Sequence, residues 1–170
     1  RKQDACEEVV KAIRDAGGEA IAVPCNISTK PELETLVART REAFGKIDIL
    51  VCNAAVNPHY GSTQEIPDSA FQKVLDCNIR SNHWLCQLVI PEMAERRDGA
   101  VIIVSSIGGL KGSSSLGTYG LSKAADMALA RNLAGTGVLG VNPGEFAAAS
   151  SSPAWTLMLA LAVTLGIDSP

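Results

Sequence analysis

The sequence predicts an α/β fold in which helices cover both faces of a parallel β-sheet. Short apolar runs alternate along the chain with longer stretches of helical periodicity. These runs are continuously apolar rather than alternately polar and apolar, which is typical of strands buried on both faces. Polar or glycine residues follow directly after the runs, and ligands in such sheets bind beyond the carboxyl ends of the strands.

The first half of the chain predicts a helix, a strand, a second helix and a second strand. Apolar residues recur at helical spacing up to Gly17, which ends the first helix. Ala20–Val23 follows as a short buried strand. Thr29 to Glu32 has the pattern of a capping box with proline in the first turn, so it predicts the start of a helix over residues 29–44. The β-rich run Ile47–Cys52 then predicts a strand.

The second half continues the same alternation. Residues from Pro67 to about Arg97 keep one apolar face and predict a long helix, in which Pro91 is a position for a bend. Val101–Val104 predicts a buried strand, and a glycine- and serine-rich loop leads from it into a helix over residues 118–134. Val138–Val141 predicts one more strand.

Composition restricts the classes of function. The 170 residues are 46% hydrophobic and 19% charged, which is typical of a folded globular protein. A formal charge of −3 offers no basic surface to nucleic acid or to an anionic membrane. Five cysteines without metal-ligand spacing predict no metal site and a reducing, cytoplasmic compartment.

The strongest chemical constellation is a tyrosine and a lysine four residues apart. Tyr119 and Lys123 project from one face of a predicted helix. A nearby ammonium stabilises a phenolate, so this spacing suits Tyr119 to general acid–base catalysis near neutral pH. Ser106 follows the strand that ends at Val104, where its hydroxyl is suited to polarise a carbonyl oxygen together with Tyr119. Taken alone, most such tyrosine–lysine pairs are solvated surface neighbours.

In this context the sequence resembles the short-chain dehydrogenase/reductase family. Asn53-Ala54-Ala55 is similar to the family's Asn-Ala-Gly motif, with Ala55 in place of glycine. Asn78 stands where the family keeps its catalytic asparagine. The resemblance implies a catalytic tetrad composed of Asn78, Ser106, Tyr119 and Lys123.

The resemblance also implies a set of cofactor-binding positions. Asn26-Ile27 occupies the place of the dipeptide that contacts adenine, and Pro143-Gly144 is similar to the pair that lies under the nicotinamide. The full implied set is Arg1, Lys2, Asn26, Ile27, Asn53, Ala54, Ala55, Tyr119, Lys123, Pro143 and Gly144.

Within the family, two segments are most similar to the peroxisomal-type NADPH-dependent carbonyl reductases and their bacterial relatives: Ala54-Ala55-Val56-Asn57-Pro58 and the opening Arg1-Lys2-Gln3. A peroxisomal location is therefore the alternative in a eukaryote. A carboxylate at the end of the family's second strand hydrogen-bonds the ribose of NAD, whereas arginine there pairs with the 2′-phosphate of NADP. Arg1 and Lys2 match the basic form, so NADP(H) is favoured over NAD(H). A basic segment exposed to solvent is the other interpretation of these two residues.

The mechanism implied by the resemblance is direct hydride transfer between NADP(H) and a ketone, aldehyde or secondary alcohol. Tyr119 exchanges a proton with the substrate oxygen, Lys123 assists it and contacts the nicotinamide ribose, and Ser106 orients the substrate. Asn78 holds a water that connects Lys123 with solvent. Two plainer interpretations remain: Ser106 caps a loop, and Asn78 satisfies backbone groups inside the long helix.

The match to the family is incomplete at both ends. We expect a Rossmann-like, doubly wound parallel sheet in three layers that lacks the first strand-helix-strand unit and its phosphate-binding glycine loop. The chain is then one incomplete dinucleotide-binding and catalytic domain over residues 1–170, truncated at both ends, in which residues 146–170 fit no family element. Two alternative functions follow: a non-catalytic family member that acts through its subunit interface, or a 3-oxoacyl carrier-protein reductase. The resemblance further implies a homodimer or homotetramer that acts on a small-molecule substrate.

Overall fold

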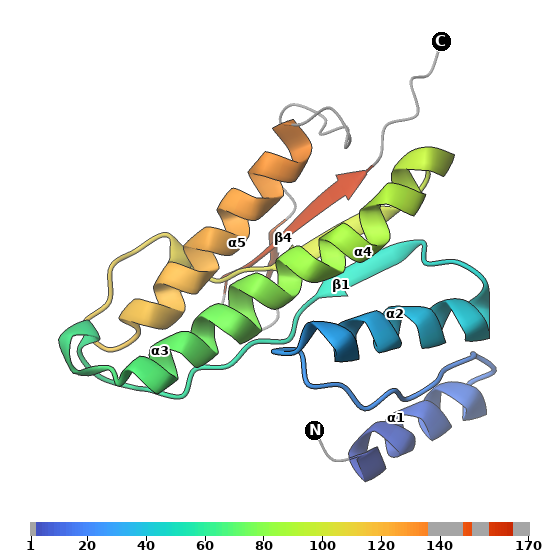
Figure 1. The fold of residues 1–170 in the computed structure, drawn as a ribbon, viewed down its shortest axis with the longest axis horizontal. Coiled ribbons are helices and arrows are strands. Elements are labelled where there is room, and N and C mark those ends of the chain that lie inside the picture. The colour runs from blue at the N-terminus through green and yellow to red at the C-terminus, as the bar shows by residue number, and fades with distance from the viewer. Residues whose placement is uncertain (1–2, 136–147, 151–156, 165–170) are drawn as a thin grey trace.

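The computed structural model of the protein describes residues 3–135, 148–150 and 157–164. Figure 1 shows several long helices lying across one side of a small sheet. The predicted strand at residues 138–141 lies outside the described residues. In chain order the elements are α1 (Gln3–Asp15), α2 (Lys30–Phe44), β1 (Ile49–Cys52), η1 (Thr63–Glu65), α3 (Asp68–Val74), η2 (Leu75–Arg80), α4 (Ser81–Arg96), β2 (Ala100–Val104), η3 (Ile107–Gly109), α5 (Gly117–Gly135), β3 (Ala148–Ser150) and β4 (Leu157–Thr164).

The described strands form one sheet in the order β1-β2-β4-β3. β1 and β2 are parallel, with Ile49 opposite Ala100 and Cys52 opposite Ile103, as the alternation of strands and helices predicts. β4, in a segment without clear periodicity, is a strand that the sequence did not predict, and it pairs antiparallel with β2 and with β3. The described sheet is therefore mixed, and the carboxyl ends of β1 and β2 lie at the same edge.

The strand predicted at Ala20–Val23 was wrong. These residues have no regular secondary structure and join none of the described strands. A strand needs a neighbour to satisfy its backbone groups, and local apolar character cannot supply one. The carbonyl of Ala20 instead accepts a hydrogen bond from Arg14 Nη2 at 2.7 Å.

The hydrophobic core lies between the sheet and three helices. Alternate residues of the strands face this core: Leu50 is opposite Val101, and Cys52 is opposite Ile103. α2, α4 and α5 supply the other side of the core, and Figure 1 shows them across one face of the sheet. On the other face of β1, Ile49 is 62% exposed. The fully buried part of this core is formed by Val37, Cys52, Cys86, Val89, Ile90, Met93, Val101, Ile103 and Ala130.

The long helix predicted from Pro67 to Arg97 is a continuous helical run, but it is not uniform. A π-helical segment, η2, separates α3 from α4, while Pro91 is accommodated inside α4. The wider π turn places the sequence neighbours Cys77 and Asn78 in the interior together. Isolated π turns are frequent at functional sites. The apolar periodicity of the sequence did not reveal this turn, because a π turn is defined by its backbone hydrogen bonds, which side-chain spacing does not report.

Ion pairs hold the far end of α4. Arg96 donates to the carbonyl of Ile47 and also pairs with Glu92 at 2.8 Å. Glu92 pairs with Arg41 of α2 at 2.7 Å as well. These contacts join α2, α4 and the residues just before β1, so they fix the helical layer relative to the strand.

The opposite end of the sheet is tied to α5 by a close backbone approach. A Cβ atom built on Gly120 of α5 would lie 2.6 Å from the carbonyl oxygen of Gly108 in η3. A Cβ atom on Gly109 would lie 2.7 Å from the backbone nitrogen of Ala124. Glycine at both positions therefore lets the turn after β2 pack directly on α5.

We expect Gly120→Ala to destabilise the protein by about 1–3 kcal/mol, because an added methyl group meets backbone that cannot move aside cheaply. Gly112→Ala is the matched control, since a Cβ atom there meets nothing within 4 Å. Denaturant unfolding of both variants measures the difference. Equal unfolding free energies for Gly120→Ala and the wild type would show that η3 and α5 are not in close contact.

Candidate functional site

The candidate site begins where the two parallel strands end. Asn53, Ala54 and Ala55 follow β1 and are exposed, whereas Ser105 and Ser106 follow β2 and are buried. The Ser105 hydroxyl donates to the backbone carbonyl of Lys123 at 2.7 Å, which joins the end of β2 to α5. The residues after both strands thus lie along the N-terminal half of α5.

Tyr119 and Lys123 lie one turn apart on α5, as their spacing predicts. The Lys123 Nζ atom is 5.8 Å from the centre of the Tyr119 ring. Tyr119 is half-buried, and Lys123 is only 2% exposed. The lysine therefore places its ammonium in the interior, directly beneath a tyrosine that still reaches the surface.

Ser106 caps η3 and lies close to the same glycine as the Tyr119 ring. Its hydroxyl oxygen accepts a hydrogen bond from the backbone N–H of Gly108 at 3.2 Å, which caps η3. A Cβ atom built on Gly108 would lie 3.6 Å from this oxygen and 4.0 Å from Cδ1 of Tyr119. Ser106 and the Tyr119 ring are therefore both neighbours of Gly108, and the cap leaves the Ser106 O–H available as a donor.

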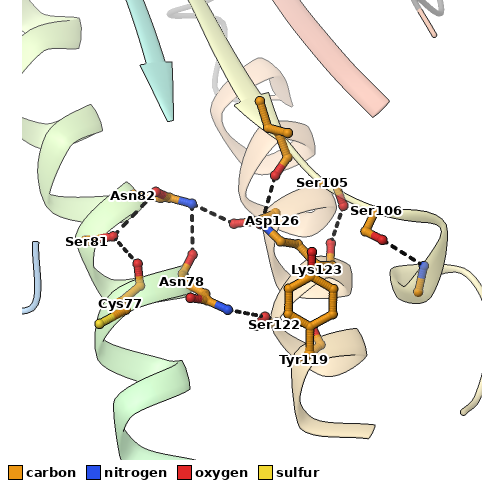
Figure 2. Close-up of polar contacts among 12 residues, drawn as sticks. Cys77, Asn78, Ser81, Asn82, Ser105, Ser106, Tyr119, Ser122, Lys123 and Asp126 are labelled. Atoms are coloured by element: carbon orange, nitrogen blue, oxygen red, sulfur yellow. Dashed lines mark hydrogen bonds and ion pairs between the residues drawn. The ribbon is translucent and has the colours of Figure 1, made fainter. Parts of the chain in front are cut away.

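The side chain of Asn78 connects three segments of the chain. Its Oδ1 accepts from the backbone N–H of Val56 at 2.8 Å, and its Nδ2 donates to the Val56 carbonyl at 3.0 Å. The same Nδ2 donates to Ser122 Oγ at 3.0 Å, and Ser122 in turn donates to the carbonyl of Tyr119. Asn78 in η2 thereby holds the loop after β1 against α5, as Figure 2 shows for the contact with Ser122.

Two residues that the sequence analysis overlooked complete the buried polar cluster. Lys123 Nζ donates to Asp126 Oδ2 at 2.9 Å and to the carbonyl of Val104 at 2.8 Å. Asn82 Nδ2 donates to Asp126 Oδ1 at 2.8 Å and to the carbonyl of Asn78 at 2.8 Å. The sequence carries one signal for Asp126, which is its helical spacing from both Tyr119 and Lys123.

Burial dominates the electrostatics of Asp126, whose side chain is fully buried. Loss of hydration raises the pKa of Asp126, and the Lys123 ammonium and the Asn82 amide counteract part of that increase. A buried lysine and a buried aspartate are each costly alone, so the pair is stable only because both partners and their hydrogen bonds are present.

The cysteines near the motif asparagines are free thiols. A hydrogen bond with Cys86, together with burial, raises the pKa of Cys52 well above its usual range. Burial likewise raises the pKa of Cys77. Because the thiolate is the nucleophile, Cys52 and Cys77 are suited to packing rather than to covalent catalysis.

The remaining sequence-predicted residues lie apart from this cluster or outside the described residues. Asn26 Oδ1 accepts from the backbone N–H of Ser28 at 3.2 Å and from its hydroxyl at 2.8 Å, so Asn26 organises the turn that precedes α2. Ile27 is half-buried in the same turn. Arg1, Lys2, Pro143 and Gly144 lie outside the described residues.

A cavity of about 450 Å³ lies on another side of α5 and is lined by Gly109, Leu110, Leu121 and Ala124 among others. Tyr119, Ser106 and Lys123 do not line it. Among the described residues, no helix is long and apolar enough to cross a membrane, and no cluster of side chains could hold a metal ion.

This is an α/β fold whose polar side chains gather beyond the carboxyl end of β2, which is where folds of this class bind their ligands. The chain belongs to the short-chain dehydrogenase family, whose model matches residues 1–151. It is 37% identical over 134 residues to dehydrogenase/reductase SDR family member 4 of Bos taurus, and 36% identical to that of Homo sapiens. These alignments cover 79% of this chain and 48% of each relative, so the chain spans about half the length of the relatives that it matches.

Solved structures agree with this assignment. An NAD⁺-bound xylitol dehydrogenase superposes with a TM-score of 0.75 and 27% identity, over 79% of this chain and 52% of that one. A 7α-hydroxysteroid dehydrogenase complexed with NADH and 7-oxo glycochenodeoxycholic acid gives a TM-score of 0.74 and 33% identity, with the same coverage. The α/β fold class predicted from the sequence is thus confirmed.

Removing only one partner of the Lys123–Asp126 ion pair is expected to destabilise the protein more than replacing both partners with apolar residues. Asp126→Leu leaves an unpaired buried ammonium and should lower the unfolding free energy by about 3–5 kcal/mol. The double variant Lys123→Met/Asp126→Leu should regain most of that loss, because neither residue then needs a charged partner. Urea unfolding at neutral pH compares the three proteins. A double variant no more stable than Asp126→Leu would contradict the pairing.

Proposed function

We propose that the protein is an oxidoreductase that transfers a hydride between NADP(H) and a ketone, an aldehyde or a secondary alcohol. The observation that carries this proposal is the placement of Tyr119 over the buried Lys123 ammonium, with Ser106 at the adjacent strand end. Family membership supports the same chemistry. Because the chain spans about half the length of its relatives, the activity of the whole protein is part of the proposal.

Each residue of the group has a role that its contacts support. Tyr119 donates a proton to the carbonyl oxygen during reduction and accepts one from the alcohol during oxidation. The Ser106 O–H donates to the same substrate oxygen and thereby orients it. Lys123 supplies the positive charge that stabilises a phenolate. Asn78 acts through its hydrogen bonds to Val56 and Ser122, which fix the loop after β1 relative to the turn of α5 that carries Tyr119.

A nicotinamide dinucleotide is the cofactor that fits this arrangement. When bound, it supplies the hydride. Of the three N–H groups of Lys123, two are used by Asp126 and Val104, which leaves one for a ribose hydroxyl. Asn53, Ala54 and Ala55 are exposed, and the two alanines have small side chains, which allows close approach of a planar ring. The solved 7α-hydroxysteroid dehydrogenase and xylitol dehydrogenase carry NADH and NAD⁺, respectively. Their cofactors support a nicotinamide dinucleotide in general, without a choice between NAD(H) and NADP(H).

Between the two nicotinamide cofactors, we propose a preference for NADP(H), which rests on the basic residues Arg1 and Lys2. We further propose that the chain is a single dinucleotide-binding domain. In this proposal it assembles into a homodimer or homotetramer through α4 and α5.

Tyr119→Phe is expected to lower kcat for NADPH-dependent reduction of a diketone or an aromatic ketone by about 10²–10⁴-fold, because the proton donor is lost. Tyr60→Phe is the matched control: Tyr60 is the only other tyrosine and is 76% exposed. The loss of NADPH absorbance follows the reaction, and circular dichroism confirms that both variants are folded. Equal rates for Tyr119→Phe and the wild type would remove Tyr119 from the mechanism.

The cofactor preference has a separate test. The double variant Arg1→Ala/Lys2→Ala is expected to raise KM for NADPH by about tenfold or more, because a charge-assisted contact to the 2′-phosphate is lost. KM for NADH should stay the same, since NADH has no such phosphate. A parallel rise in both KM values would assign these residues to folding rather than to cofactor selection.

A further inference from the structure

The Lys123 ammonium is half of a buried ion pair. Asp126 Oδ2 lies 2.9 Å from Lys123 Nζ, and the two side chains are 0% and 3% exposed, respectively. Asp126 follows Lys123 by three residues and Tyr119 by seven, so all three side chains lie along one face of α5. Figure 2 shows the three side chains on the same helix. Along α5, Lys123 therefore stands between Tyr119 and Asp126, 5.8 Å from the tyrosine ring centre and 2.9 Å from the carboxylate.

We propose that Asp126 is a positioning residue that fixes the Lys123 ammonium and sets how much positive charge acts on Tyr119. The catalytic meaning of this inference rests on the proposed function. A free ammonium would act on a phenolate as a full positive charge. An ammonium paired with a carboxylate acts as a dipole whose positive end faces the tyrosine, and its influence is correspondingly weaker.

Asn82 explains why the carboxylate keeps this orientation. The Asn82 amide donates both to Asp126 Oδ1 and to the carbonyl of Asn78, at 2.8 Å each. Asp126 is thereby anchored through α4 to the π turn that carries Asn78. One oxygen of the carboxylate faces Asn82 and the other faces Lys123, so rotation of the carboxylate would break two hydrogen bonds in a buried environment.

Other titratable groups lie near the Lys123–Asp126 pair, and their ionisation also affects how the pair responds to pH. Tyr119 lies on the same helix, while Cys52 of β1 and Cys86 of α4 interact electrostatically with Asp126. The two thiols hydrogen-bond with each other. A direct measurement at the tyrosine separates its ionisation from that of these thiols.

The test uses the absorbance of the phenolate near 295 nm. The chain has only two tyrosines, so Tyr60→Phe gives a protein in which Tyr119 is the sole tyrosine. In this background, Asp126→Asn should move the ionisation midpoint of the remaining tyrosine to lower pH by about one unit, because the compensating negative charge is lost. Lys123→Met should move the midpoint to higher pH. Glu92→Gln should leave it unchanged, although it also removes a partly buried carboxylate that pairs with arginines.

A second variant keeps the inference testable if Asp126→Asn fails to fold. Lys123→Met/Asp126→Leu replaces the ion pair with apolar side chains that can pack in its place. Because the pair acts on Tyr119 only as a dipole, removing both charges should raise the tyrosine midpoint by less than removing Lys123 alone. A midpoint that rises as far in this double variant as in Lys123→Met would show that Asp126 has no influence on Tyr119, and would overturn the inference.

Kinetics then separate this inference from the proposed function. In alcohol oxidation, the acidic limb of the kcat/KM profile should shift in Asp126→Asn by the same amount as the titration, with KM for the alcohol unchanged. A purely structural role would lower activity equally at every pH. If the wild-type protein turned over neither ketones nor alcohols, the proposed function would be overturned. The tyrosine titration would still show whether Asp126 influences Tyr119. Normal turnover with an unmoved midpoint in Asp126→Asn would overturn this inference alone.

Discussion

The buried Lys123 ammonium is the constraint on which the arrangement of the candidate site depends. A lysine that is 2% exposed must find hydrogen-bond partners for its ammonium inside the protein. It finds them in the carbonyl of Val104 at the end of β2 and in Asp126 on its own helix. The Ser105 hydroxyl reinforces the contact from the other direction. Together these bonds draw the end of β2, which Ser106 follows, onto the helix that carries Tyr119.

The polar character of the contact between η2, α4 and α5 contrasts with the apolar contact between the helices and the sheet. Asn78, Asn82, Ser122 and Asp126 are almost completely buried where a well-packed apolar interface would be at least as stable. Every one of them is hydrogen-bonded within the described residues. A polar layer of this kind fixes relative positions through directional bonds, whereas apolar contacts tolerate sliding. Such a layer is what a site requires if a proton donor must stay at one distance from its partners.

The sequence allowed prediction of the features that are decided locally. Gly45 ends α2 with a positive φ of 82°, and the continuous apolar run after Gly99 is β2, as expected. The spacing of Tyr119 and Lys123 placed both side chains on one helix face for the same reason. Features that depend on tertiary contacts were not predicted correctly. Ala20–Val23 is apolar but has no partner strand in the described residues. β4 is recognised as a strand only from its pairing with β2. Asp126 was missed because an acidic residue in a helix is normally solvated, and only the folded protein shows Lys123 and Asn82 around it.

The contacts that hold the candidate site residues do not use the exposed edge of β1. In the described sheet β1 is at one edge, and its side chains Ile49 and Val51 are 62% and 53% exposed. Strands of an α/β sheet are ordinarily covered on both faces, so this edge and face are where further chain can pack. The cluster of Asn78, Tyr119, Lys123 and Asp126 lies on the helical side and is closed by bonds among η2, α4, α5 and the end of β2. The placement of Tyr119 therefore depends on bonds within the helical layer, at the end of β2 and in the loop after β1, and not on the exposed edge of β1.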